Sequence, residues 1–285
     1  MGMKASNAIA TFFKYFVLIL VGLIMIYPLL WMISATFKDN SEIFAGIGLW
    51  IKNPTLEGYK NALNNFGGSI NILQAMLNTY SYVIPKVICT VVSACIAAYG
   101  FGRFDFPGRK ILFSIMLATL FLPQVVLNVP QFLLYTKFGW VNSPFYLAIW
   151  VHCAFATETY FVYQLVQFMR NVPRDLDEAA AIDGCNSFQT LYKVIVPMLM
   201  PALVSCALFQ FMWSCNDFMG PLLYVQTPAK YPMSLFVKLS MDGDTGFAWN
   251  RILALSLISI LPQLIVFFCA QDQFVEGISA GAVKG

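Results

Sequence analysis

Residues 178–187 read EAAAIDGCNS, a polar stretch in a chain whose other long segments are strongly apolar. Its alanine-rich first half favours a short helix, which Gly184 is expected to end because glycine adopts a left-handed backbone without strain. A second short helix is predicted to begin near Ser187, and one of its faces would carry the apolar residues Phe188, Leu191 and Ile195. Neither helix is long enough to cross a bilayer, so the pair is expected outside the membrane or at its surface.

The composition is that of a membrane protein. Of the 285 residues, 59% are hydrophobic and only 11% are charged, whereas soluble domains contain about 25% charged residues. The 17 basic and 14 acidic residues leave a net charge of +3 and are scattered along the chain, which argues against nucleic-acid binding. The seven cysteines form no C-x-x-C pair, so we interpret them as small apolar packing residues.

The apolar segments predict an all-α polytopic membrane protein, organised as a single domain over residues 1–285. Six membrane spans are expected within residues 16–270, at positions 16–35, 78–99, 111–135, 144–168, 198–220 and 252–269. The third of these spans contains Pro123 and Pro130, so its helical hydrogen bonding is expected to break inside the membrane. Such a break is tolerated where the backbone is buried in protein or lines a cavity.

The distribution of lysine and arginine predicts the orientation. Residues 1–15 contain two lysines and no acid, and the loop after the second span holds Arg103, Arg109 and Lys110, so both are expected in the cytoplasm. Six spans then place the polar loop 171–197 and the tail 271–285 on the same side. A cleaved signal peptide is the competing interpretation of the N-terminus, but its apolar segment should be shorter than the first span.

Few residues in the sequence could catalyse a reaction or bind a metal or a nucleotide. The single histidine, His152, excludes a Ser-His-Asp triad and any metal site with two histidines; we expect it to form a hydrogen bond between helices. No G-x-x-x-x-G-K-[ST] motif occurs, so any ATP must be bound by another subunit. The chain is therefore expected to be a transport subunit rather than an enzyme, with no metal site and no cofactor of its own.

Ionisable groups inside membrane spans are costly and point to function. Glu158 and Asp217 are the clearest cases, whereas Lys86 is expected to reach the membrane surface as an anchor. Aromatic rings interleaved with amides and carboxylates suit a sugar, because rings stack on its C–H faces while its hydroxyls need fixed hydrogen-bond partners. The predicted substrate pathway comprises Asn128, Glu158, Trp213, Asn216, Asp217 and Tyr224.

The polar stretch also resembles a known motif. Glu178-Ala179-Ala180, three residues, Gly184, nine residues and then Val194-x-Val196-Pro197 are similar to the EAA loop of ATP-binding-cassette (ABC) importer permeases. Further matches, including Phe101-Gly102-Arg103-Phe104, Asn216-Asp217-Phe218 and the ending Gly281-Ala282-Val283-Lys284-Gly285, resemble the second permease subunit of carbohydrate importers, the maltose-permease-like branch. Cys215 stands where that branch commonly has tryptophan.

This resemblance implies a type I, MetI-like permease fold in a bacterial inner membrane. It also implies three kinds of partner: a homologous second permease subunit, an ATPase dimer that binds ATP and Mg²⁺, and an extracytoplasmic sugar-binding protein. Carried over by motif, the ATPase-docking residues are Glu178, Ala179, Ala180, Asp183, Gly184 and Pro197. The tail residues near the ATPase are Gly281, Lys284 and Gly285.

Two other function classes remain open at the level of the sequence. An ion- or proton-coupled carrier would use Glu158, Asp217 and His152 as a relay, and its uptake would survive ATP depletion. A membrane-embedded enzyme would need Glu158 and Asp217 as a catalytic pair, and the purified chain alone would form product. Within the importer interpretation, the sequence does not name the sugar or say whether it is neutral or acidic.

Overall fold

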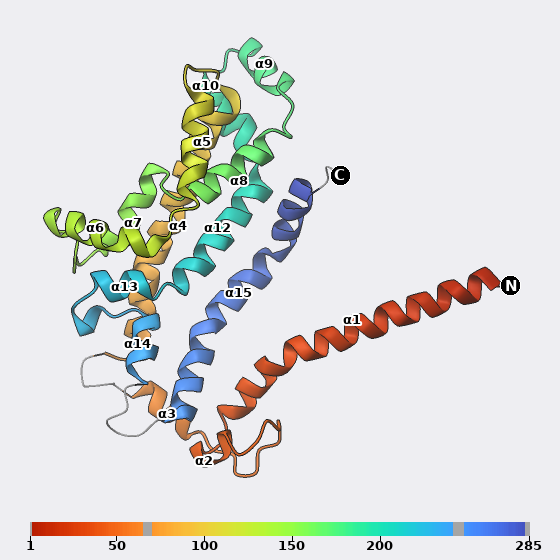
Figure 1. Ribbon diagram of the computed structural model, residues 1–285, viewed down its shortest axis with the longest axis vertical. Helices are drawn as coiled ribbons and strands as arrows, with labels where there is room; N and C mark the ends of the chain where they lie inside the picture. Colours follow the sequence, from red (N-terminus) through yellow and green to blue (C-terminus); the bar gives the residue numbers. More distant parts are fainter. Residues whose placement is uncertain (1, 65–69, 242–247, 283–285) are drawn as a thin grey trace. The chain divides into compact units, whose positions relative to one another are not determined.

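The computed structural model describes residues 2–64, 70–241 and 248–282, and its regular elements are helices (Figure 1). The chain forms two compact units. The first comprises Met1–Ile72 and Val237–Ile260, and the second comprises Leu73–Phe236 and Leu261–Gly285. The single domain over residues 1–285 stays a prediction.

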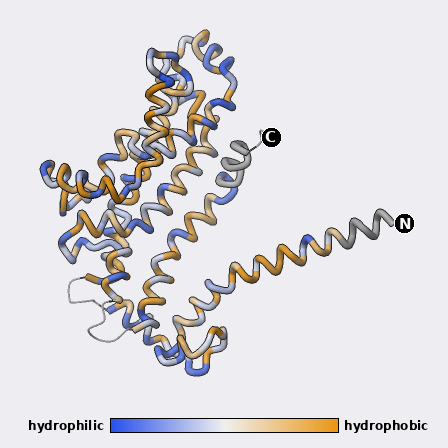
Figure 2. Tube along the Cα trace, in the orientation of Figure 1, coloured by the Kyte–Doolittle hydropathy of each residue, from blue (hydrophilic) through white to orange (hydrophobic). Residues whose placement is uncertain are grey.

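The first unit contains the apolar N-terminal helix α1 (Gly2–Ala35), the short helices α2 (Asn40–Ile43) and α3 (Glu57–Leu63), and the start of α15 (Trp249–Ala282). Most of α1 is apolar, as its orange colour in Figure 2 shows. Its segment Ala10–Ala35 has a mean hydropathy of 2.7, and none of its most apolar stretch is buried within the chain. Lipid or another protein must therefore cover its surface.

The loop after α1 packs against the start of α15 within this first unit. Gly58 lies so close to Asn250 that an added Cβ would meet the Asn250 carbonyl oxygen at 2.7 Å. The Asn250 backbone N–H donates to Asn40 Oδ1 at 3.0 Å. Phe44 and Trp249 meet edge to face, with ring centroids 5.2 Å apart. The segment after α1 is thus held against the start of α15 by contacts at residues 40, 44 and 58.

The second unit contains most of α4 (Ile72–Arg103) and two helices that meet at a sharp bend. Helix α5 (Arg109–Thr119) and helix α6 (Gln124–Lys137) are inclined by 100°. The break at Pro123 confirms the predicted interruption of the third span, because proline has no N–H with which to continue the helix. Pro130, by contrast, lies within α6.

The predicted fourth span, residues 144–168, is not one helix. It consists of α7 (Leu147–Trp150), a 3₁₀ helix η1 (Val151–Phe155) and α8 (Thr159–Met169). Ala156 has a φ of 55°, in the left-handed region, so the helix cannot continue through it. Glu158, expected in the middle of a span, therefore lies at the N-terminus of α8, where the helix dipole favours a negative charge.

The predicted fifth span is preceded by several short helices. These are α9 (Asp175–Ile182), α10 (Ser187–Thr190), a π-helix η2 (Leu191–Ile195) and α11 (Val196–Met198). Helix α12 (Met200–Cys215) follows after a bend of 79°, and α13 (Met219–Tyr224), η3 (Pro228–Lys230) and α14 (Met233–Leu239) come after it. Within the described residues, three helices are long and apolar enough to cross a membrane, or up to five if each bent pair is one span.

Within the second unit, helix α8 contacts α5 and α12 (Figure 1). Its residues Phe161, Leu165 and Met169 are fully buried, together with Ala98 of α4 and Cys206 of α12. An added Cβ on Gly102 would lie 2.8 Å from Met169 Sδ, so α4 and α8 approach closely there. Cys95, Cys153, Cys206 and Cys215 are buried free thiols, as expected for packing residues.

Candidate functional site

The polar loop 171–197, called the EAA segment below, forms short helices, of which α9 and α10 are joined by a tight turn. The end of α9 is a Schellman motif, in which Cys185 N–H donates to Ala180 O at 2.9 Å and Gly184 N–H donates to Ala181 O at 3.1 Å. Gly184 has a φ of +79°, a conformation that favours glycine. An added Cβ there would meet nothing within 4 Å, so backbone conformation rather than space requires the glycine.

A capping box starts the second helix. Asn186 Oδ1 accepts from the Gln189 backbone N–H, and Gln189 Oε1 accepts from the Asn186 backbone N–H, both at 2.9 Å. The following π-helix η2 shifts the helical register, since it has more residues per turn than an α-helix. Leu191 and Ile195 are consequently buried, but Phe188 is 68% exposed. The prediction that these three residues share one face is wrong for Phe188.

The predicted docking residues differ in exposure. Glu178, Ala179, Asp183, Gly184 and Pro197 are exposed, whereas Ala180 is buried against its own chain. Of the predicted tail residues, Gly281 lies in the last turn of α15, and Lys284 and Gly285 lie outside the described residues. Docking on an ATPase stays a prediction for all of them.

Helix α9 is linked to the end of α4 by an ion pair. Arg103 Nε lies 3.2 Å from Asp177 Oδ2, and the two side chains are 7% and 24% exposed. Arg103 Nη2 also donates to Val172 O at 3.0 Å, at the entry to the EAA segment. Because the arginine is buried, removing one partner would leave the other charge uncompensated in a poorly hydrated site.

The second site is a polar cavity of about 320 Å³ within the second unit. Five of the six predicted pathway residues line it: Asn128, Glu158, Trp213, Asp217 and Tyr224. The cavity also contains residues that the sequence prediction did not include, namely Lys86, Gln124, Gln131, Tyr135, His152 and Gln210. A polar side chain within an apolar run was the available signal for the glutamines and for Lys86. That these side chains all face one cavity could be seen only from the folded structure.

Asn216, the sixth predicted residue, does not line the cavity. Its Nδ2 donates to Met212 O at 2.8 Å and to Gln263 Oε1 at 3.1 Å, so it closes the end of α12 and contacts α15. Lys86, expected to reach the membrane surface, instead lines the cavity. The ring of His152 stacks on Tyr135, with centroids 6.2 Å apart.

Asp217 is held by the turn between α12 and α13. Its Oδ1 accepts from Gly220 N–H at 3.0 Å, and an added Cβ on Gly220 would lie 2.6 Å from Asp217 Oδ2. Ser234 Oγ donates to the Asp217 backbone oxygen at 2.9 Å. The glycine therefore gives the carboxylate room, and the turn fixes its position at the wall of the cavity.

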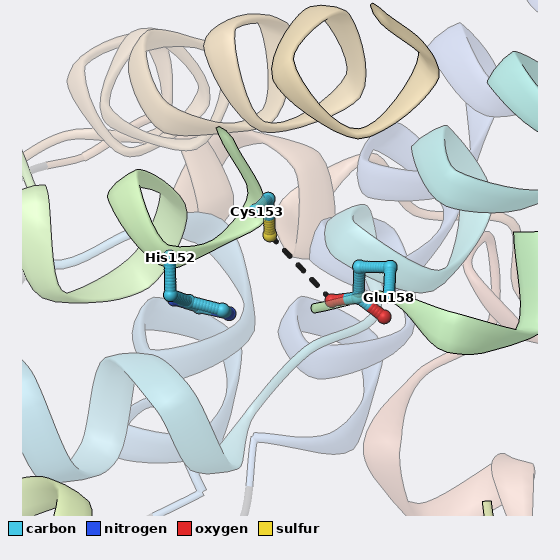
Figure 3. A group of neighbouring side chains, drawn as sticks. All are labelled: His152, Cys153 and Glu158. Carbon is cyan, nitrogen blue, oxygen red and sulfur yellow. Dashed lines mark hydrogen bonds between the residues drawn. The ribbon is translucent and has the colours of Figure 1, made fainter. Parts of the chain in front are cut away.

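Figure 3 shows His152, Cys153 and Glu158 converging at the break before α8. Their potential ligand atoms lie within 4.8 Å of one another, and Cys153 Sγ lies 3.5 Å from Glu158 Oε1, to which it donates. The thiol thus uses its one donor on one of the two carboxylate oxygens. Because the Lys86 ammonium lines the same cavity and opposes a cation, we assign no metal to this cluster.

The fold combines bent apolar helices around a polar cavity with an exposed helix pair that carries the EAA motif. These features are those of a membrane permease that is driven by a separate subunit. Residues 90–276 match a protein family described as the binding-protein-dependent transport system inner membrane component. The chain belongs to this family. It is a multi-pass inner-membrane permease subunit of an ABC system and not itself the ATPase.

Individual relatives match over almost the whole chain. A probable ABC transporter permease of Pyrococcus horikoshii is 31% identical over 271 residues, covering 93% of this chain and 94% of that protein. The trehalose/maltose transport system permease protein of Thermococcus litoralis is 31% identical over 267 residues, covering 94% of each chain.

A solved structure supports the fold. It is a bacterial ABC transporter involved in the import of the acidic polysaccharide alginate, and one of its chains matches with a TM-score of 0.78. The match covers 94% of this chain and 98% of that chain at 20% identity. The all-helical permease fold predicted from the sequence is therefore confirmed.

Proposed function

We propose that this permease imports an oligosaccharide together with three kinds of partner. It pairs with a homologous second permease subunit, docks on an ATPase dimer through α9 and α10, and receives sugar from an extracytoplasmic binding protein. ATP and Mg²⁺ are bound by the ATPase, while this chain forms half of the translocation pathway.

The observation that carries the proposal is the exposed EAA helix pair. Ile182 is 87% exposed and Phe188 is 68% exposed, and both lie in a segment rich in charged and polar residues. The rings of Phe188 and Tyr192 pack at a tilt of 49°, with centroids 6.0 Å apart, and form a ridge at the start of the second helix. Exposed aromatic residues with a polar rim are typical of a protein-docking surface.

The pathway cavity supports a carbohydrate as the cargo. Its wall combines aromatic rings with amide and carboxylate groups, which suits C–H faces and hydroxyls respectively. The relative from Thermococcus litoralis, whose name specifies trehalose and maltose, is consistent with such a cargo. The proposed cargo is therefore a small oligosaccharide that passes the side chains of Trp213, Asp217 and Glu158.

In the proposed mechanism, closure of the ATPase dimer moves the docked α9 and α10. The Arg103–Asp177 pair passes this displacement to α4, and the helices rock about the cavity so that it opens to alternate sides. This requires both termini and the EAA segment to lie in the cytoplasm, the orientation that the lysine and arginine distribution favours.

The test is uptake by proteoliposomes that contain both permeases, the ATPase and the binding protein. With labelled di- and trisaccharides outside and ATP inside, uptake should continue when an ionophore collapses the ion gradients and stop when ATP is removed. Uptake that persists without ATP but collapses with the gradient would instead support the carrier mechanism based on Glu158 and Asp217. Chemical conversion of the sugar by the chain alone would support the enzyme.

A further inference from the structure

We propose that this chain binds the headgroup and one acyl chain of an anionic phospholipid in a groove beside the loop between α4 and α5. The groove has a volume of about 600 Å³ and is formed by the end of α4, the loop 104–108, the start of α5 and the end of α8. We call it the basic groove, because Arg109, Lys110 and Arg170 line it. The transport mechanism described above does not use it.

The charges in the basic groove are not balanced. Its one acidic residue, Asp105, pairs with Arg109. Arg170 donates to the neutral Gln167 Oε1 at 3.3 Å, and Lys110 has no ion pair within the described part of the chain. Two cationic side chains are thus left without an acid, and the first turn of α5 adds the partial positive charge of a helix N-terminus. The groove is complementary to a phosphate group.

The floor of the basic groove is apolar. Phe101 packs against Phe106 and Phe113, with ring centroids 6.0 Å and 5.4 Å apart, and Val166 is buried beneath them. A small soluble anion would leave this aromatic floor uncovered. An amphiphile with a phosphate above and methylene groups below would cover both parts of the groove.

A shallow, open pocket continues from the basic groove along one face of α5. It has a volume of about 400 Å³, shares Lys110 and Ile111 with the basic groove, and runs past Ser114, Ile115 and Ala118. Ile111, Ile115 and Ala118 are spaced i, i+4 and i+7, so they lie on one helix face. From residue 110 to residue 118 the helix rises roughly 12 Å, enough to hold much of an acyl chain.

The location favours a membrane lipid as the occupant. The loop with Arg103, Arg109 and Lys110 is the one that we expect at the cytoplasmic surface, where anionic headgroups are abundant and attract basic clusters. The cationic mouth therefore lies at headgroup depth and the apolar track leads from it into the bilayer. Phosphatidylglycerol has the required phosphate, glycerol backbone and acyl chains.

Native mass spectrometry of the delipidated importer complex, titrated with phosphatidylglycerol, tests the proposal. The triple variant Arg109→Gln, Lys110→Gln, Arg170→Gln should bind the tightest phosphatidylglycerol between about 10-fold and 100-fold more weakly. Lys52→Gln, Lys60→Gln, Lys137→Gln removes the same charge from exposed positions elsewhere and should leave this affinity unchanged. If the triple variant does not fold, Lys110→Gln alone, at an exposed residue without an ion pair, should weaken binding about fivefold.

Two further measurements separate a lipid from a soluble anion. Glycerol phosphate should compete only weakly, and Ile111→Ser with Ile115→Ser should reduce the affinity for phosphatidylglycerol while leaving that for glycerol phosphate unchanged. Equal affinities for the two compounds, or equal losses in the groove variant and the charge-matched control, would overturn the proposal. So would unchanged phosphatidylglycerol binding in the groove variant.

Discussion

Gly184 shows how one residue's backbone can control a docking element. Its φ of +79° ends α9 and turns the chain into α10, while the space around its Cα is empty. A side chain at this position therefore costs about 1–2 kcal/mol through backbone strain, not through a clash. Asparagine tolerates the left-handed conformation better than other residues, so it provides a matched control.

We predict that Gly184→Val uncouples transport from ATP hydrolysis, whereas Gly184→Asn retains most of both. The reconstituted complex would be assayed for sugar uptake and ATPase activity in parallel, after confirming that each variant inserts in the membrane. A fall in uptake per ATP should appear in the valine variant alone. Full transport by Gly184→Val would show that the turn does not control docking.

Two substitutions at Asp217 separate the effect of its negative charge on transport from the effect of its hydrogen bond on the fold. The carboxylate lines the cavity and also accepts a hydrogen bond from Gly220 N–H. Asp217→Asn keeps an oxygen for this bond but removes the charge, while Asp217→Ala removes both. Since charged hydrogen bonds are worth about 1 kcal/mol more than neutral ones, we expect Asp217→Asn to lower uptake about fivefold, with a smaller loss of protein stability than Asp217→Ala because the Gly220 N–H keeps an acceptor.

The alanine variant should lose uptake and also unfold at a lower temperature, because the Gly220 N–H is left without its acceptor. Transport kinetics and thermal unfolding of the purified complex would be measured side by side. Asn216→Ala is a useful comparison, since Asn216 contacts α15 rather than the cavity. Normal kinetics in both Asp217 variants would remove this residue from the pathway.

Among the elements, the ion pair between α4 and α9 is the most direct connection by which motion of the docked EAA segment could reach the membrane helices. Arg103 of α4 pairs with Asp177 of α9 and also donates to the Val172 carbonyl, which lies in the segment just before α9. We predict that Asp177→Asn reduces uptake per ATP by about tenfold or more, because it leaves the mostly buried arginine without its counter-ion. Asp175→Asn neutralises an exposed acid in the first turn of α9 and should change uptake little.

A charge exchange sharpens this test. The double variant Arg103→Asp, Asp177→Arg reverses the pair and should recover part of the activity that each single change removes. The coupling free energy from the double-mutant cycle is the measured quantity. Purely additive losses would mean that the two residues act separately, and the pair would then have no part in transmitting motion.

For the whole molecule, the orientation in the membrane follows from charges that lie far apart in the sequence. In vesicles that contain the permease without the ATPase, and in a background in which Cys185 and Cys269 are serine, Asp183→Cys should react with an impermeant maleimide only from the cytoplasmic side. Lys52→Cys should react only from the outside. Labelling of inside-out and right-side-out vesicles would measure both, and the reversed pattern would contradict the proposed topology.

The sequence by itself determined the membrane class, the helical fold, the position of the EAA turn and the dependence on another subunit for ATP. Each of these follows from local information: long apolar runs, a glycine after an alanine-rich helix, proline in a span, and a missing nucleotide motif. These signals act within a few residues, so no tertiary contact is needed to interpret them.

Only the tertiary structure decided how distant residues combine. In the structure, the predicted fourth span is interrupted at Ala156, and Glu158 lies at a helix N-terminus. Lys86 lines the same cavity as Asp217. The tertiary structure also turned Phe188 outward, because a π-helix altered the expected register. A side chain's direction and its neighbours depend on how separate helices pack, and this information is spread over the whole chain rather than held in any one segment.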